Sequence, residues 1–211
     1  AQLLGQAPPP AKVQRAATHV GSAEALRAQL GARDFRTRLK AVQALAHHPG
    51  DENEAALIET LRDRSVEVAV DAVHSLQSLA GPRARATLRA VLDNADGYFH
   101  PLVRAAAVHA LGQLPGAPET PRVEQALYDQ DAEVSIAAIA ALSASAPELA
   151  REALLRVLDQ GQFFLPITRL AAARSLSRLR GVPPARVAAF AEREGDVDVR
   201  EVLSELAAAQ A

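Results

Sequence analysis

The chain has 211 residues, a formal net charge of −2 and a pI near 6.3, so it lacks the overall basic field of an electrostatic nucleic-acid binder. It contains no cysteine, which excludes disulfides, thiol nucleophiles and zinc–thiolate sites. Hydrophobic residues make up 49% of the chain but aromatic residues only 3%, and this Ala- and Leu-rich composition favours closely packed helices over strands.

Residues 1–22 are expected to form a proline-containing leader and a capping helix. Between residues 11 and 20, apolar side chains recur at the helical spacing, at Val13, Ala16, Ala17 and Val20. Gly21 is expected to end this helix, and Ser22 to cap the next one. A start at Ala1 without methionine favours a processed protein or a fragment. We therefore expect an exported (periplasmic) or membrane-tethered bacterial protein, with a cytoplasmic location left open.

From residue 23 onward, one pattern recurs six times. Each copy ends in an Ala-rich helix that closes on a leucine, and the five clear closing residues are Leu45, Leu76, Leu111, Leu142 and Leu176. They are 31, 35, 31 and 34 residues apart, and a sixth copy ends near residue 206. Such a period is typical of a solenoid of stacked helix pairs, so residues 23–211 are predicted to form one repeat domain.

Each copy is predicted to contain a first helix, a short turn and a second helix. The first helices carry apolar pairs three or four residues apart, which gives each of them one apolar face. Natural N-cap residues stand in the turns, among them Asp34, Ser65, Asp131 and Asp196. Proline and glycine separate the copies where the period requires a break. The sequence therefore predicts an all-α, right-handed α-solenoid (superhelix) of about six helix pairs.

Two of the closing runs carry a family resemblance. Residues 103–111 and 131–142 resemble bacterial HEAT-like repeats of the short class first noted in phycobilin lyases, whose second helix reads Asp, then Val-Arg, then Ala-x-x-Ala-Leu. The resemblance covers roughly residues 23–207. It implies a helical solenoid, but such repeats serve many unrelated roles. Two alternatives that it leaves open are a phycobilin-lyase-like chaperone and a HEAT-like nucleic-acid-binding protein.

The arginine of this motif is missing from two copies. Arg38, Arg104 and Arg169 occupy the position in the first, third and fifth copies, whereas Ala69 and Ser135 replace it in the second and fourth. The sixth copy has Val199-Arg200, but matching the motif there moves the closing residue to Ala207. We expect the three arginines to bond carboxylates or carbonyls of neighbouring turns.

The two longer spacings come from insertions between the helices of the third and fifth copies. The inserts resemble each other and contain four of the seven aromatic residues of the chain, namely Tyr98, Phe99, Phe163 and Phe164. Equivalent loops of a solenoid emerge along one edge, where insertions often bind partners. Two interpretations stay open: the rings anchor a partner, or they fill the gap between helix layers. The two are compatible, because one ring of each pair can point inward while the other contacts a partner.

A polar column lies two residues before the closing leucines of the second helices. Its members are Gln43, His74, His109, Ala140 and Arg174. In solenoids of this family the second helices line the concave face, so this column is a candidate binding surface, although a solvated face would carry the same residues.

No motif for catalysis, phosphate binding or a cofactor is present. His74 and His109 occupy equivalent positions on neighbouring repeats. Helix axes pack about 8–10 Å apart, which is a wide separation for two histidines to share one zinc ion without further ligands. Arginines gather in two places, among interleaved acidic residues: Arg83, Arg85 and Arg89, then Arg174, Arg178, Arg180 and Arg186. We therefore predict a non-catalytic scaffold or adaptor without metal or cofactor, which binds another protein, alone or as a subunit of a larger complex.

Overall fold

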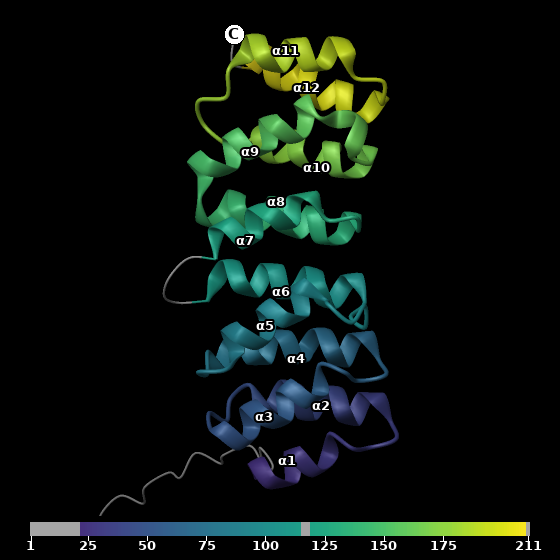
Figure 1. The fold of residues 1–211 in the computed structure, drawn as a ribbon, viewed down its shortest axis with the longest axis vertical. Helices are drawn as coiled ribbons and strands as arrows, with labels where there is room; N and C mark the ends of the chain where they lie inside the picture. The colour runs from purple at the N-terminus through teal and green to yellow at the C-terminus, as the bar shows by residue number, and fades with distance from the viewer. Residues whose placement is uncertain (1–21, 115–118, 210–211) are drawn as a thin grey trace, which may run out of the picture.

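The computed structural model describes residues 22–114 and 119–209, and these residues form helices, turns and loops without a strand. The helices follow one another as six pairs along the long axis of the molecule (Figure 1). This arrangement confirms the predicted all-α solenoid. The capping helix expected at residues 11–20 lies outside the described residues.

The first and second helix of each pair are joined by a turn. The pairs are α1 (Ala23–Gln29) with α2 (Phe35–Leu45), α3 (Asp51–Thr60) with α4 (Val66–Leu79), α5 (Ala84–Asp93) with α6 (Pro101–Gln113), α7 (Thr120–Gln125) with α8 (Ala132–Ser145), α9 (Pro147–Asp159) with α10 (Pro166–Leu176), and α11 (Pro184–Arg193) with α12 (Val197–Ala209). Short 3-10 turns follow α7 (Ala126–Tyr128) and α9 (Gly161–Phe163).

The second helices begin at the expected N-cap residues, but the cap side chains differ in their partners. The Asp34 carboxylate accepts a hydrogen bond from the Thr37 N–H at 3.0 Å, and that of Asp196 accepts one from the Val199 N–H at 3.2 Å. The Ser65 hydroxyl instead donates to Glu67, and Asp131 accepts from Arg104. Two of the four cap side chains are therefore engaged in other contacts.

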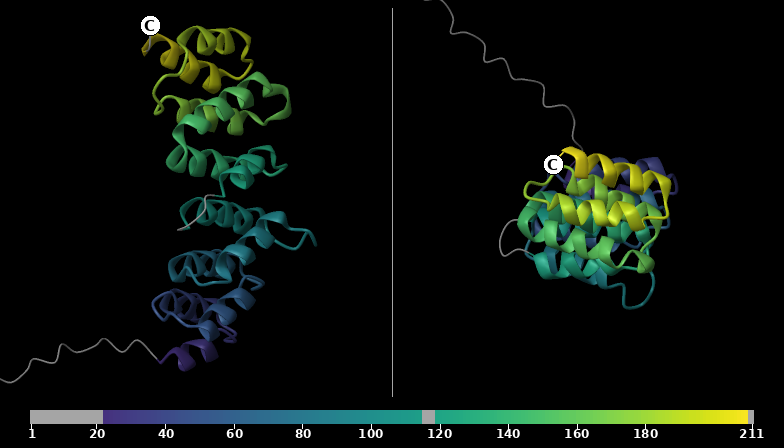
Figure 2. Two further views of the ribbon diagram at one scale, coloured as in Figure 1. Left: turned by 60° about the vertical axis from the view of Figure 1, so that its left-hand side comes forward. Right: turned by 90° about the horizontal axis from the view of Figure 1, so that it is seen from above.

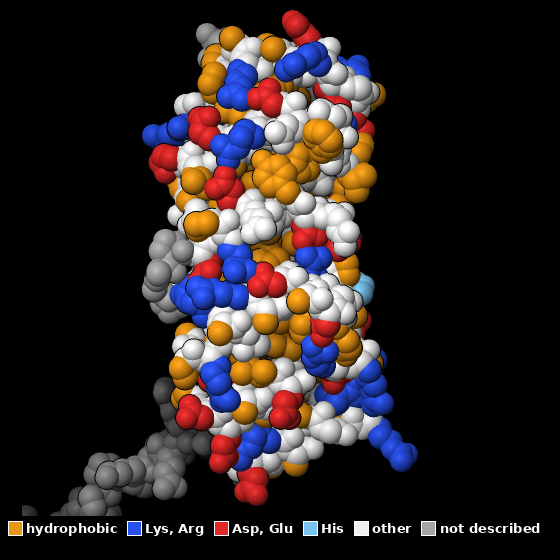
Figure 3. All heavy atoms as spheres, viewed as in Figure 1, with side chains coloured by type: hydrophobic (Ala, Val, Ile, Leu, Met, Phe, Trp, Pro, Cys, Tyr) orange, Lys and Arg blue, Asp and Glu red, His pale blue; other side chains and the backbone are white. Residues whose placement is uncertain are grey.

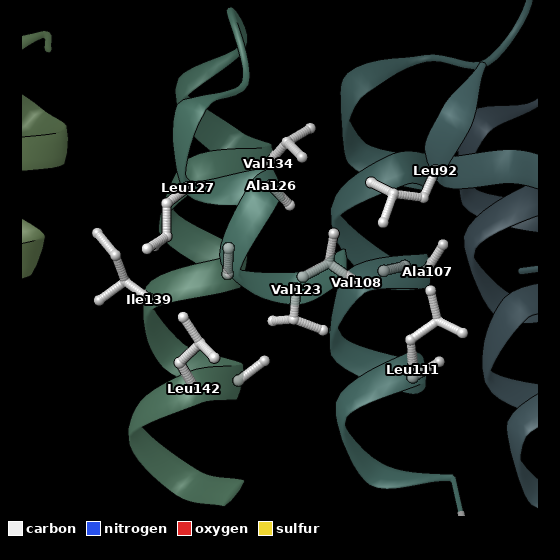
Figure 4. Close-up of a cluster of buried hydrophobic side chains, with 14 of the residues drawn as sticks. Leu92, Ala107, Val108, Leu111, Val123, Ala126, Leu127, Val134, Ile139 and Leu142 are labelled. Atoms are coloured by element: carbon white, nitrogen blue, oxygen red, sulfur yellow. The ribbon is translucent and has the colours of Figure 1, made fainter. Parts of the chain in front are cut away.

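The hydrophobic core lies between the layer of first helices and the layer of second helices. The second helices form a continuous series, in which each contacts the next from α2 to α12. The five closing leucines are all buried, as the period predicts: Leu45, Leu76, Leu111, Leu142 and Leu176. Figure 4 shows Val108 of α6 beside Val123 of α7 at one inter-repeat contact. The views in Figure 2 show the pairs as one elongated stack.

Within the described ranges, no helix is both long and apolar enough to cross a membrane.

Candidate protein-binding rim and second-helix face

The six turns that join the first and second helix of each pair lie along one edge of the stack, here called the rim, on the right in Figure 1. Just inside this rim, buried ion pairs link neighbouring repeats at every second junction. Arg38 donates to both carboxylate oxygens of Asp63, at 2.7 and 2.8 Å, and also to the carbonyls of Ala32 and Arg33. Repeat 1 is thus tied to the turn of repeat 2.

The same arrangement recurs two and four repeats later. Arg104 of repeat 3 donates to Asp129 and Asp131 in the turn of repeat 4. Arg169 of repeat 5 donates to both oxygens of Glu194 in repeat 6, at 2.8 and 2.9 Å, and to the carbonyl of Phe164 at 2.7 Å. These contacts confirm that the motif arginines bond carboxylates and carbonyls of neighbouring turns.

The ion pairs stabilise the charged form of the acids. Burial by itself would raise the pKa of Asp63, but hydrogen bonds from Arg38 and the Ser65 N–H outweigh burial and hold this pKa below its ordinary value of 3.8. The Arg169 guanidinium likewise lowers the pKa of Glu194 below 4.5, against the opposing effect of burial.

The first insert contacts the repeat that precedes it. The Tyr98 ring lies under the Arg62 guanidinium, 4.4 Å from ring centroid to Cζ, and its hydroxyl donates to the Arg62 carbonyl at 2.9 Å. Phe99 is half-buried against the core and meets Tyr98 edge to face at 5.5 Å. This insert therefore joins repeat 3 to repeat 2, a junction that has no motif arginine.

In the second insert, one aromatic ring packs against the protein and the other is exposed to solvent. Phe164 is half-buried against the core, and its ring lies 5.6 Å from that of Tyr128 in repeat 4. Phe163 is 78% exposed, the largest value among the exposed large hydrophobic side chains. One ring packs and the other is available for contact, as one of the interpretations of the sequence allowed.

Other apolar side chains on the rim were missed by the sequence reasoning. Leu102 and Ile167 occupy the second position of α6 and α10 and are 48% and 56% exposed. The other four second helices carry a charged residue at this position: Arg36, Glu67, Glu133 and Asp198. Tyr128 and Leu165 are also exposed. Alignment of the six copies at this position would have found the signal.

The predicted polar column lies on the surface of the second helices. All five of its residues are exposed, namely Gln43, His74, His109, Ala140 and Arg174. Gln43 donates to Asp71 of the next repeat at 2.5 Å, and His109 lies 2.7 Å from the amide nitrogen of Gln113. The column is therefore accessible along the stack, and its binding role stays a prediction.

The first predicted arginine cluster is largely neutralised within the protein. Arg83 pairs with Glu54, while Arg85 and Arg89 pair with Glu119. Hydrogen bonds from Arg89 and Arg85 hold the pKa of Glu119 below its ordinary value of 4.5, although burial opposes this shift. These arginines stabilise junctions between repeats.

The described residues contain no group of three or more His, Asp or Glu side chains placed to hold a metal ion.

One family model agrees with the repeat architecture. A family model described as HEAT repeats matches residues 23–100. Among solved structures, the chain is similar to one from the complex of CpcE and CpcF of phycocyanin lyase from Nostoc sp. PCC7120. The two share 20% sequence identity, and the match covers 90% of this chain and 82% of that chain at a TM-score of 0.44. No curated protein matches the chain.

Proposed function

We propose that this chain, a HEAT-like helical repeat protein, is a non-catalytic scaffold or adaptor that binds another protein. The proposed contacts are the rim at the inserts of repeats 3 and 5 and the exposed column on the second helices, the face expected to be concave. A rigid stacked array presents such a surface with little conformational cost on binding, so a few apolar anchors can supply most of the affinity.

The observation that carries this proposal is the exposed apolar group on the rim of repeats 4 and 5. It consists of Tyr128, Phe163, Leu165 and Ile167. The Tyr128 ring contacts Phe164 of the neighbouring repeat, which connects the group across the junction. Figure 3 shows hydrophobic side chains gathered over α9 and α10. Contiguous exposed apolar surface of this kind marks interaction sites in soluble proteins.

Charge supports a protein partner over nucleic acid. Arg83, Arg85 and Arg89 each form an ion pair with an acidic side chain of this chain, so they do not form a free basic surface. Arg174, Arg178 and Arg180 form no ion pair within the described residues, but so few cations would give only a small counterion release on nucleic-acid binding.

The test is affinity capture from native cell extract with the double variant Phe163→Ala/Ile167→Ala beside the unmodified chain. A matched control, Phe35→Ala/Val197→Ala, removes two exposed apolar side chains from the rim at repeats 1 and 6. One stoichiometric protein captured by the unmodified chain and the control, but lost from the double variant with its helical circular dichroism intact, is the expected result. Equal capture by all three would contradict the rim as the binding edge.

The same experiment addresses the two alternative functions. Nucleic acid as the captured species would favour the nucleic-acid-binding alternative. A bound tetrapyrrole, detected by its visible absorption, would favour the chaperone alternative.

A further inference from the structure

The exposed face of α10 changes from apolar to basic along its length. Ile167 near its start is exposed, and Leu170 and Ala171, one turn later, are partly exposed. Arg174 follows one turn further along the same face, and Arg178 lies in the turn just beyond Leu176, the last residue of the helix; both arginines are exposed. The result is a face with an apolar half next to the rim and a basic half next to the turn that leads to α11.

The arginines of the basic half differ from most others in the protein. The guanidinium groups of Arg174, Arg178 and Arg180 make no ion pair and no hydrogen bond within the described part of the chain, whereas twelve other arginines form ion pairs. Cations that no ion pair neutralises are available to an anionic partner.

The neighbouring helix α8 widens the apolar half. Helices α8 and α10 are in direct contact, and equivalent positions of stacked repeats lie side by side. At the positions of Leu170, Ala171, Arg174 and Arg178, α8 carries small or apolar side chains that are exposed or partly exposed: Ile136, Ala137, Ala140 and Ala144. Exposed Glu133 stands at the position of Ile167. On the other side, α12 carries exposed Glu201 and Glu205 at the equivalent positions. An anionic ligand is therefore expected over α8 and α10 and not over α12.

We propose that the surface formed by Ile136, Ala140, Ile167, Leu170, Arg174 and Arg178, the α10 strip, binds an amphipathic helix of the partner whose first turn is acidic. This inference rests on the proposed protein-binding function. The apolar face of the partner helix packs against Ile136, Ala140 and Ile167, and its acidic residues pair with Arg174 and Arg178.

The orientation of the partner helix follows from its charges. Acidic residues stabilise a helix most in its first turn, where the macrodipole is positive. With that turn at Arg174 and Arg178, the partner helix runs antiparallel to α10. Ile167 and Leu176, the last residue of α10, are nine positions apart, which corresponds to about 14 Å at the helical rise of about 1.5 Å per residue. The helical part of the strip thus matches roughly two and a half helical turns.

The test is selection from a display library of random 16-residue peptides on the full chain. The unmodified protein is expected to select peptides with apolar residues at helical spacing and Asp or Glu in the preceding turn. The variant Arg174→Glu/Arg178→Glu is expected to select Lys or Arg in place of the acids, and to bind the original peptides about tenfold more weakly at low salt. Circular dichroism checks that it folds.

The matched control is Arg33→Glu/Arg36→Glu, which makes the same charge change at two exposed arginines on the rim of repeat 1. It is expected to select the same acidic peptides as the unmodified chain. An unchanged acidic preference in Arg174→Glu/Arg178→Glu, or none in the unmodified chain, would overturn the α10 strip. If Phe163→Ala/Leu165→Ala, which alters two exposed rim residues outside the strip, then abolished selection, the rim as a binding surface would still stand. Failure to select any peptide family would count against both proposals.

Discussion

Arg38 and Asp63, which belong to the first and second repeats, form a two-point ion pair that is largely hidden from solvent. The equivalent pairs join Arg104 to Asp129 and Arg169 to Glu194. Successive arginines and successive acids are each 66 and 65 residues apart. The ion pairs therefore repeat with a period of two helix pairs, so the structural unit of this solenoid is a tandem of repeats.

The aromatic inserts lie at the junctions between repeats that no motif arginine crosses. Arg62 and Tyr128, also 66 residues apart, lie in the turns of repeats 2 and 4, and each receives rings from the insert of the following repeat. Buried ion pairs thus link repeats 1–2, 3–4 and 5–6, while aromatic contacts link repeats 2–3 and 4–5. The two copies that lack the arginine, the second and the fourth, are each followed by a copy with an aromatic insert, so the two features belong to one arrangement.

Replacement of Arg104 by alanine is expected to lower the free energy of unfolding by roughly 3 kcal/mol, because it leaves Asp129 and Asp131 without their buried cation. Urea denaturation followed by circular dichroism measures this change. Arg156→Ala, which breaks the more exposed pair with Glu124, serves as the comparison and should cost less than about 1 kcal/mol. Equal losses in the two variants would show that burial of the pair is unimportant.

The repeat period was readable from the sequence because every copy must bury the same leucine, as Leu76 and Leu142 illustrate. The arginine contacts were also predictable in kind, since a motif residue beside a turn has few other partners. Which of the insert rings is exposed could not be predicted from the sequence. Phe163 and Phe164 are adjacent and chemically identical, and only the three-dimensional position of Tyr128 decides which ring packs. The exposed rim residues Leu165 and Ile167 escaped notice for a similar reason, because aliphatic residues in a helical repeat are ordinarily core.

Stability is expected to fall in acid as the buried carboxylates become protonated. The pKa values of Asp63, Glu119 and Glu194 in the folded protein lie below their ordinary values of 3.8 and 4.5. Their stabilising contribution is therefore complete above those ordinary values, and is lost as the pH falls through the folded-state pKa. Urea midpoints measured from neutral pH downward should decline steeply only below about pH 4.5.

Substitution of Glu119 isolates one part of this acid response. Glu119→Gln should be less stable than the unmodified chain at neutral pH, and should show a shallower decline in acid, because the titrating group that pairs with Arg85 and Arg89 is gone. Glu133→Gln alters an exposed carboxylate that forms no ion pair within the described residues, and should leave the profile unchanged. A Glu119→Gln profile parallel to that of the unmodified chain would contradict the assignment.

The two adjacent phenylalanines of the second insert are expected to differ in their contribution to stability. Phe164→Ala removes a ring that packs against the core and Tyr128, and should lower the free energy of unfolding by roughly 2 kcal/mol. Phe163→Ala removes a largely exposed ring and should change stability by less than about 0.5 kcal/mol. Chemical denaturation of both variants measures the difference, and the reverse order would mean that the insert packs the other way round.

Gly112 of α6 lies close to Ala141 of α8. A Cβ atom added at this residue would lie 3.0 Å from the Cβ of Ala141. Gly112→Val is therefore expected to force the two helices apart and to lower the free energy of unfolding by about 1–3 kcal/mol. Gly112→Ala combines a gain in helix propensity of about 1 kcal/mol with the same contact, so its net effect should be small.

The exchange Gly112→Ala/Ala141→Gly moves the methyl group across the interface, and should be more stable than expected from the sum of the two single variants. Thermal and urea unfolding of these variants measures the coupling. Strict additivity would mean that Gly112 and Ala141 do not limit the spacing of the repeats, and that another contact sets the rise of the solenoid at its third junction.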